Sequence, residues 1–185
     1  MLSQRVIYDA ITEIPCLAGR ESVENHGLSG KTALPFRPPH FLYYPTHMLI
    51  RLIYASRARS LSPDDVKEIL KASRRNNAAL GITGALCLSN GIFLQCLEGE
   101  RMAVNSLYHR ILLDERHHEP AILDFEEIVC RQFGEWSMGL IHSVPENQAL
   151  FLKYAAGPQF DPYEMRPNTL RAFFSELLGN ARWLG

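Results

Sequence analysis

The chain has 185 residues, of which 46% are hydrophobic and 21% are charged, and its formal net charge is -1. This length allows one domain with a well-formed core plus additional chain at an end. The balanced charge gives no electrostatic drive toward nucleic acid or an anionic membrane, and no apolar run approaches the roughly 20 residues that span a bilayer. Residues 1–16 lack the apolar core of a signal peptide, so the cytoplasm is the expected compartment.

Residues 1–47 differ in composition from the rest of the chain. They contain a cluster of prolines between Pro35 and Pro45 and show no sustained period of 2 or 3.6. This composition predicts a disordered or loosely attached extension. The abrupt change of character at Met48 leads to the hypothesis that native translation starts there and that the extension is non-native.

From Met48 onward the pattern is regular. Residues 49–55 alternate and are rich in β-branched and aromatic side chains, which predicts a strand. Ser62 followed by proline and two acids predicts a helix start, and helical spacing continues to about Asn77. Gly81 is expected to close the turn.

The remaining elements follow in order. Residues 83–88 and 91–97 are apolar runs that Asn90-Gly91 joins as a predicted hairpin, with residues 98–100 ending the second strand. A helix is predicted around Val104–Leu112. Further elements are predicted as strands at 121–129 and 138–144, a short helix at 145–154 and a last helix at 170–178 that stops at Gly179.

Two β-α-β units around a hairpin are typical of a ferredoxin-like α+β sandwich with a mixed sheet. The two long helices are expected to cover one face of the sheet, and the C-terminal helices the other. The domain is predicted to span residues 48–144, and residues 145–185 are predicted to form a helical output or oligomerisation segment.

Cysteines and histidines do not predict a metal site. The four cysteines include no C-x-x-C pair and are expected to be structural thiols. His117 and His118, taken as adjacent residues on a helix, would point in different directions, and they have no further ligands at metal-binding spacing.

Fold alone does not specify function, so polar and aromatic residues within the strands and helices are the candidates. They are Tyr54, Asn76, Asn77, Gln95, Trp136 and Met138. Helix capping and core packing are the ordinary explanations for most of them. Gln95 is different, because an unpaired amide in the apolar run 92–97 would cost a few kcal/mol. Either it bonds to backbone as a core amide, or it touches a ligand on the face that it shares with Phe93.

Five segments, in order and with compatible spacing, resemble the BLUF domain, the sensors of blue light using FAD. They are R-L-I-Y-A-S (51–56), S-R-R-N-N-A-A-L-G-I-T-G (73–84), F-L-Q-C-L-E-G (93–99), Y-H-R-I-L-L-D-E-R-H-H (108–118) and F-G-E-W-S-M (133–138). The family fold is the same ferredoxin-like sandwich. The C-terminal tail further resembles short cyanobacterial BLUF proteins of the PixD type, while residues 1–47 have no counterpart.

The resemblance implies a flavin between the two long helices. The implied cofactor-binding residues are Ile69, Asn76, Asn77, Phe93, Gln95, Arg110, Ile111, Asp114 and His117. Gln95 would bridge Tyr54 and the ring, and Tyr54 would give an electron and a proton to it after excitation. Gln95 would then rearrange and bias Trp136, Met138 and the helices that follow. A response-regulator-like protein partner and a homo-oligomer, as stacked rings, are further implications.

Two other classes remain open. A flavin-dependent oxidoreductase would need a nicotinamide or substrate site, and the chain has no G-x-G-x-x-G. A ferredoxin-like interaction module without flavin, such as an RNA-binding domain, would need basic residues and exposed aromatics on its sheet. The neutral charge and apolar strands oppose this second class.

Overall fold

The computed structural model of the protein describes residues 48–142, 145–181 and 183. The predicted N-terminal extension, residues 1–47, lies outside the described residues. All described residues belong to one of the two units into which the chain divides, residues 42–185.

A five-stranded sheet forms the centre of this unit. The strands are β1 (Leu49–Ala58), β2 (Thr83–Ser89), β3 (Ile92–Glu100), β4 (His117–Glu127) and β5 (Gly139–His142). Their spatial order is β4-β1-β3-β2-β5, and every neighbouring pair is antiparallel except β2 and β5. The predicted mixed sheet and ferredoxin-like α+β class are therefore confirmed.

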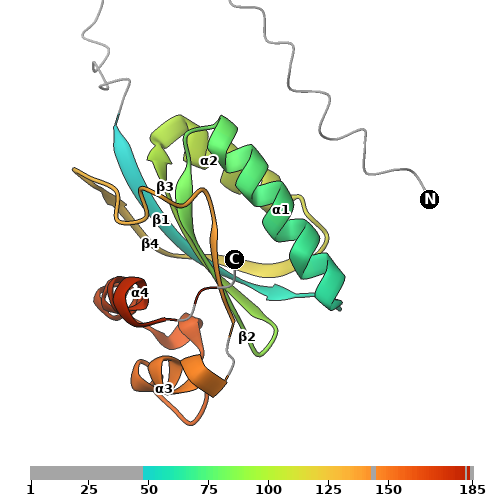
Figure 1. Ribbon diagram of the computed structural model, residues 1–185, viewed down its shortest axis with the longest axis vertical. Coiled ribbons are helices and arrows are strands. Elements are labelled where there is room, and N and C mark those ends of the chain that lie inside the picture. The colour runs from blue at the N-terminus through green and yellow to red at the C-terminus, as the bar shows by residue number, and fades with distance from the viewer. Residues whose placement is uncertain (1–47, 143–144, 182, 184–185) are drawn as a thin grey trace, which may run out of the picture. The chain divides into compact units, whose positions relative to one another are not determined.

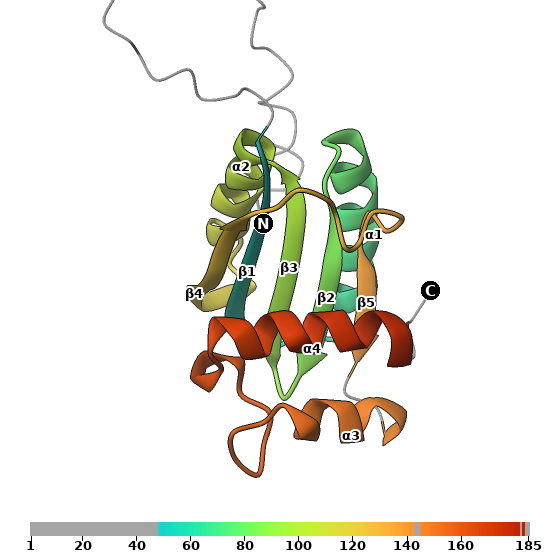
Figure 2. The ribbon, with the colours of Figure 1, turned by 90° about the vertical axis from the view of Figure 1, so that its left-hand side faces the viewer.

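Helices cover both faces of the sheet (Figures 1 and 2). The helical segments are α1 (Pro63–Ala79), α2 (Arg101–Leu112), α3 (Pro145–Lys153), the 3-10 turn η2 (Pro162–Glu164) and α4 (Pro167–Asn180). As predicted, α1 and α2 lie together on one face, while α4 crosses the strands on the opposite face. None of the helices in the described ranges is long and apolar enough to cross a membrane.

Local sequence signals account for several element ends. Ser62 caps α1 and forms a capping box with Asp65, which satisfies two helix N–H groups. Asn90 and Gly91 both have positive φ, 51° and 72°, as the two-residue hairpin between β2 and β3 requires. Gly81 also has positive φ, 61°, at the turn after α1.

Other boundaries differ from the sequence predictions because pairing between strands decides them. β3 continues to Glu100, whose side chain accepts a hydrogen bond from Ala103 N at 3.1 Å and so caps α2. β4 begins at His117, which pairs with Ala58 of a longer β1, so the adjacent histidines lie on a strand and not on a helix.

The observed boundaries of β5 and α4 also differ from the sequence predictions. β5 begins at Gly139, one residue after the predicted start, and residues 143–144 of the predicted strand lie outside the described residues. Gly179 does not end the last helix, because it lacks the positive φ of a glycine stop and α4 runs on to Asn180.

Two hydrophobic cores lie on opposite faces of the sheet. The core under α1 and α2 includes Ile50, Leu52, Tyr54, Ile69, Phe93, Leu97, Val104, Tyr108 and Met138. The core under α4 includes Ile53, Leu94, Cys96, Phe133, Phe151, Phe160, Leu170, Phe173 and Phe174. Because side chains alternate along β1 and β3, each strand contributes to both cores, and a polar residue can be placed on either face.

Candidate functional site

The two central strands place Tyr54 and Gln95 opposite each other, as a register pair of β1 and β3. Tyr54 is fully buried and Gln95 is 5% exposed. The Tyr54 hydroxyl donates a hydrogen bond to Gln95 Oε1, and Gln95 Nε2 donates to Met138 Sδ at 3.4 Å. The buried amide therefore bonds to two other side chains in this structure, and both of them lie in the core under α1 and α2.

Burial sets the protonation of the phenol. It raises the pKa of Tyr54 well above its ordinary range, and the nearby Tyr108 and Asp114 raise it further. The Tyr108 ring meets the Tyr54 ring edge-on, with centroids 5.2 Å apart. Tyr54 is therefore a neutral hydrogen-bond donor at any physiological pH.

Asn77 connects the end of α1 to the segment before β5. Its side chain is buried, and Nδ2 donates to the Ser137 carbonyl at 2.9 Å. Asn76 is half-buried, and its Oδ1 accepts from Arg75 Nε at 3.4 Å. Neither asparagine is the C-cap of the helix, which is Leu80.

Two apolar residues and one arginine of the predicted set lie on the facing helices. Ile69 of α1 is buried, and Ile111 of α2 is half-buried against the same core as Tyr54 and Phe93. Arg110, also of α2, is half-buried in the last turn of that helix. The sequence-predicted apolar contacts thus come from two helices that flank one face of the sheet.

Asp114 lies just after the end of α2, and His117 is the first residue of β4. His117 Nδ1 lies 2.7 Å from Ser56 Oγ, and its ring centroid lies 4.7 Å from that of Phe93. Burial lowers the pKa of His117, an effect that the Asp114 carboxylate opposes. Asp114 accepts hydrogen bonds from Arg116, which outweigh its burial and lower its pKa.

Trp136 and Met138 occupy opposite sides of the sheet. Met138 is 2% exposed and contacts Gln95. Trp136 packs with the other core, 4.1 Å from the Trp183 ring and 6.5 Å from the Phe133 ring, measured between centroids. In this structure the methionine, and not the tryptophan, lies beside the glutamine.

The structure adds residues that sequence reasoning missed. Ser56 lies in a quoted segment, yet only the pairing of β1 with β4 brings it to His117. Ser137 contributes a main-chain carbonyl, which no side-chain pattern signals. Tyr108 begins another quoted segment, and its contact with Tyr54 follows from packing alone. In the described part of the chain no cluster of histidine, cysteine, aspartate or glutamate could hold a metal ion.

Fold and geometry together define an α+β domain with a tyrosine–glutamine–methionine chain on the face that α1 and α2 cover. The family profile described as "BLUF: Sensors of blue-light using FAD" matches residues 49–139. The photoactivated adenylate cyclase subunit beta of Euglena longa is 38% identical over 92 residues, 49% of this chain and 11% of the relative. The blue light- and temperature-regulated antirepressor BluF of Escherichia coli is 33% identical over 94 residues, 50% of this chain and 23% of the relative.

Solved structures extend the similarity beyond the sequence match. The structure of BlsA in its photo-activated state has a TM-score of 0.65 and is 32% identical, covering 71% of this chain and 96% of that one. The chain belongs to the BLUF family of blue-light sensors. It spans only a small part of the curated relatives it matches, about a tenth of the cyclase subunit and a quarter of the antirepressor.

The residues present fit the flavin that BLUF domains bind. A glutamine side chain has two N–H donors and two acceptor lone pairs, and Tyr54 and Met138 use one of each. One N–H donor and one acceptor lone pair of Gln95 therefore remain. They could bond to a ring edge that carries both hydrogen-bond donors and acceptors. Apolar walls with a few placed polar groups are typical of such pockets.

Proposed function

We propose that this chain is a blue-light photoreceptor that holds FAD non-covalently and passes its signal to a protein partner. The single observation that supports this function best is the buried chain from the Tyr54 hydroxyl through the Gln95 amide to the Met138 sulfur. A bound flavin supplies the absorption of blue light and, once excited, enough oxidising power to take an electron from a neutral phenol.

We assign the retention of FAD to residues of α1, α2, β3 and β4 and of the turn between α2 and β4. Ile69 and Ile111 would pack on the faces of the ring, and Asn77 would bond the O4/N3 edge. Asn76 and Arg110 would address the O2 side. The polar groups Asp114 and His117, with Phe93 beside the latter, would lie near the ring or the ribityl chain.

Tyr54 is the proposed donor of both an electron and a proton. Because its pKa is raised, the phenol keeps its proton until the electron leaves, and the hydrogen bond to Gln95 gives that proton a path. Return of both particles to the tyrosine leaves the Gln95 amide rearranged, by rotation or by a tautomer change. Once the lit state has decayed, the covalent structure of the protein is the same as before excitation.

The second partner of Gln95 makes its rearrangement inexpensive. A thioether sulfur is a weak acceptor, so breaking the 3.4 Å contact from Gln95 to Met138 costs less than breaking a bond to a carbonyl. Met138 lies directly before β5, which leads to α3 and α4. We infer that a changed Gln95 biases Met138, β5 and the C-terminal helical segment, residues 145–185, which would serve as the output element.

The partner follows from the family and from the tail. Relatives of this domain are named as cyclase subunits and as an antirepressor, so BLUF domains serve different outputs. For this chain we propose a response-regulator-like protein partner and a homo-oligomer of stacked rings, based on the resemblance of residues 152–157 and the last helix to the PixD-type tail. Analytical ultracentrifugation in darkness and under blue light measures the oligomer directly.

The decisive experiment is an absorption spectrum of the purified protein before and after blue light, without added reductant. A yellow protein whose flavin bands shift reversibly to the red is expected. Bleaching that needs a reductant would instead indicate an oxidoreductase, and a colourless protein would indicate an interaction module.

Matched tyrosine variants test the proposed donor. Tyr54→Phe is expected to bind FAD and lose the shift, whereas Tyr108→Phe, which alters the neighbouring ring, is expected to keep it. A normal light-induced shift in Tyr54→Phe would refute the donor role.

A further inference from the structure

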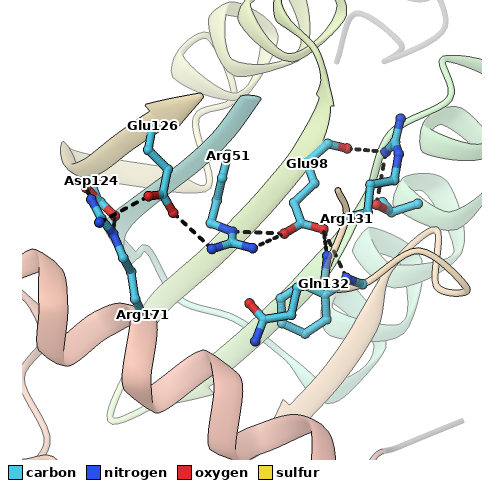
Figure 3. Close-up of polar contacts among 9 residues, drawn as sticks. Arg51, Glu98, Asp124, Glu126, Arg131, Gln132 and Arg171 are labelled. Carbon is cyan, nitrogen blue, oxygen red and sulfur yellow. Dashed lines mark hydrogen bonds and ion pairs between the residues drawn. The ribbon is translucent and has the colours of Figure 1, made fainter. Parts of the chain in front are cut away.

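A buried carboxylate lies on the same strand as Gln95, three residues further along β3. Glu98 is fully buried on the α4 side of the sheet, and both of its oxygens are bonded (Figure 3). Oε1 accepts from Arg51 Nε at 2.8 Å and Nη2 at 2.7 Å. Oε2 accepts from the main-chain N–H groups of Gln132 and Phe133 at 2.8 and 2.9 Å. One side chain thus joins the sheet to the loop between β4 and β5.

Arg131 strengthens this attachment. Its guanidinium donates to the Glu98 carbonyl at 2.6 Å and to Thr83 Oγ1 at 3.0 Å, and also to the Gly81 carbonyl at 2.6 Å. The loop is therefore held at residues 131–133, only a few residues before Met138. Within the connecting segment, Trp136 N donates to the Phe133 carbonyl at 3.0 Å, two residues before Met138.

In the other direction the ion pairs continue to α4. Arg51 also donates to Glu126 at 2.9 Å, and Glu126 pairs with Arg171 of α4 at 3.0 Å. Arg171 makes two further bonds to Asp124, at 2.6 and 2.8 Å. Figure 3 shows one continuous chain of contacts from α4 across β4, β1 and β3 to the loop.

We propose that Glu98 is a positioning residue that couples α4 to the loop carrying Met138, and through Met138 to Gln95. The light-dependent part of this proposal rests on the proposed function. Leaving the buried Glu98 carboxylate without its partners would be strongly unfavourable, so we expect the groups bonded to it to move together. A displacement of Met138 therefore reaches α4 through residues 131–133, Glu98 and Arg51, in addition to the direct path along the chain through β5.

The coupling is tested first in darkness, at the end far from the flavin. Arg171→Gln removes the cation from α4 at a half-exposed position, and the glutamine NH₂ group can still donate to the buried Asp124 carboxylate, so the variant is expected to fold. Amide hydrogen exchange at Gln132 and Phe133 is expected to accelerate at least about threefold. The matched control is Lys153→Gln, which removes the ion pair between α3 and Glu176 of α4 without touching the network. Unchanged exchange at both amides in Arg171→Gln, or equal acceleration in the control, would overturn the coupling.

The second measurement is the half-life of the red-shifted state after the light is switched off. Arg171→Gln is expected to lengthen it at least about threefold, since the network holds Met138 in the arrangement seen here. Glu98→Gln keeps the side-chain shape but replaces one acceptor oxygen by a donor. This substitution interrupts the network between Arg171 and the loop. A double variant with Glu98→Gln and Arg171→Gln is therefore expected to recover at the same rate as Glu98→Gln alone. Additive effects, or an unchanged half-life in Arg171→Gln, would refute the proposal. Absence of any red shift in the wild type would refute the proposed function instead, and the exchange result in darkness would still decide the coupling.

Discussion

Asn77 gives the sharpest test of how the helix side of the site is held. Its side chain is 1% exposed, and it donates one hydrogen bond, from Nδ2 to the Ser137 carbonyl at 2.9 Å. Asn77→Ala removes this donor and every polar contact that the amide would make with the ring. Asn77→Asp keeps the size of the side chain but replaces the NH₂ group by an acceptor.

The magnitude follows from two opposing effects. The lost bond costs about 0.5–1.5 kcal/mol, and as much as about 3 kcal/mol if the Ser137 carbonyl stays unpaired. Alanine offsets up to about 0.7 kcal/mol of this through its higher helix propensity. Asn77→Ala is thus expected to lower the free energy of unfolding by about 1 kcal/mol. Asn77→Asp is expected to lower it more, because aspartate brings no such gain and its charge opposes the helix dipole.

Urea unfolding of both variants measures the stability effect, and the ratio of flavin to protein absorbance after gel filtration measures retention. If the lost polar contact with the ring contributes about 1.4 kcal/mol to binding, FAD is expected to bind about tenfold more weakly. If Asn77→Ala keeps the wild-type flavin ratio, the position assigned to the ring is wrong. If it unfolds at the wild-type urea concentration, the bond to the Ser137 carbonyl does not contribute to stability.

Three further predictions concern the amide, the histidine and the strand packing. Gln95→Ala is expected to retain FAD and lose the light-induced red shift, because the phenol then has no path to the ring. Because burial lowers the pKa of His117 below its ordinary 6.5, the unfolded chain binds that proton first on acidification. The free energy of unfolding is therefore expected to fall as pH drops through 6.5, and His117→Asn is expected to reduce this slope. Gly84→Ala would place a Cβ 2.0 Å from the Cys96 carbonyl oxygen and is expected to cost at least about 2 kcal/mol, whereas Gly134→Ala, with its nearest neighbour at 3.8 Å, is expected to be neutral.

Each of these outcomes has a contrary result. Retention of the full red shift in Gln95→Ala would remove the amide from the mechanism. An identical pH dependence of urea unfolding in His117→Asn would show that another group is responsible. Equal thermal stability of Gly84→Ala and Gly134→Ala would show that β2 and β3 separate at no cost.

Features set by neighbouring residues could be predicted from the sequence. Ser62 with its acids identified the start of α1, and Asn90-Gly91 identified the hairpin, because capping and turn geometry depend on a few adjacent residues. The alternation of β3 likewise placed Gln95 on the same face as Phe93, where both join the core side covered by α1 and α2.

Features set by distant residues could not be predicted in the same way. Asn77 and Ser137 are 60 positions apart, and the residues adjacent to either of them do not predict the hydrogen bond between them. Glu98 looked like the charged end of a strand, yet it is fully buried because Arg51, 47 positions away, neutralises it. The early start of β4 at His117 follows from the length of its partner β1. Pairing and charge compensation across the sheet, not local propensity, decided these features.

The placement of Trp136 and Met138 leads to one more prediction about the signal. In a regular strand residues two apart share a face, but here β5 begins only at Gly139, and the two side chains join cores on opposite faces. Bringing Trp136 to Gln95 would break the hydrogen bond from Gly84 N to the Trp136 carbonyl, 3.0 Å, and the contact with Trp183.

Displacement of the Met138 side chain alone keeps both of these contacts and the bond from Arg74 Nε to the Met138 carbonyl, 3.1 Å, and is therefore the less costly route. Trp136→Phe is accordingly expected to retain the red shift and a recovery half-life within about twofold of the wild type, since the benzyl ring still packs against the same core. Met138→Ala removes the sulfur acceptor of Gln95 and is expected to change that half-life by about tenfold or more, which corresponds to a coupling of at least about 1.4 kcal/mol. A larger effect from the tryptophan substitution than from the methionine substitution would mean that the two side chains do exchange places.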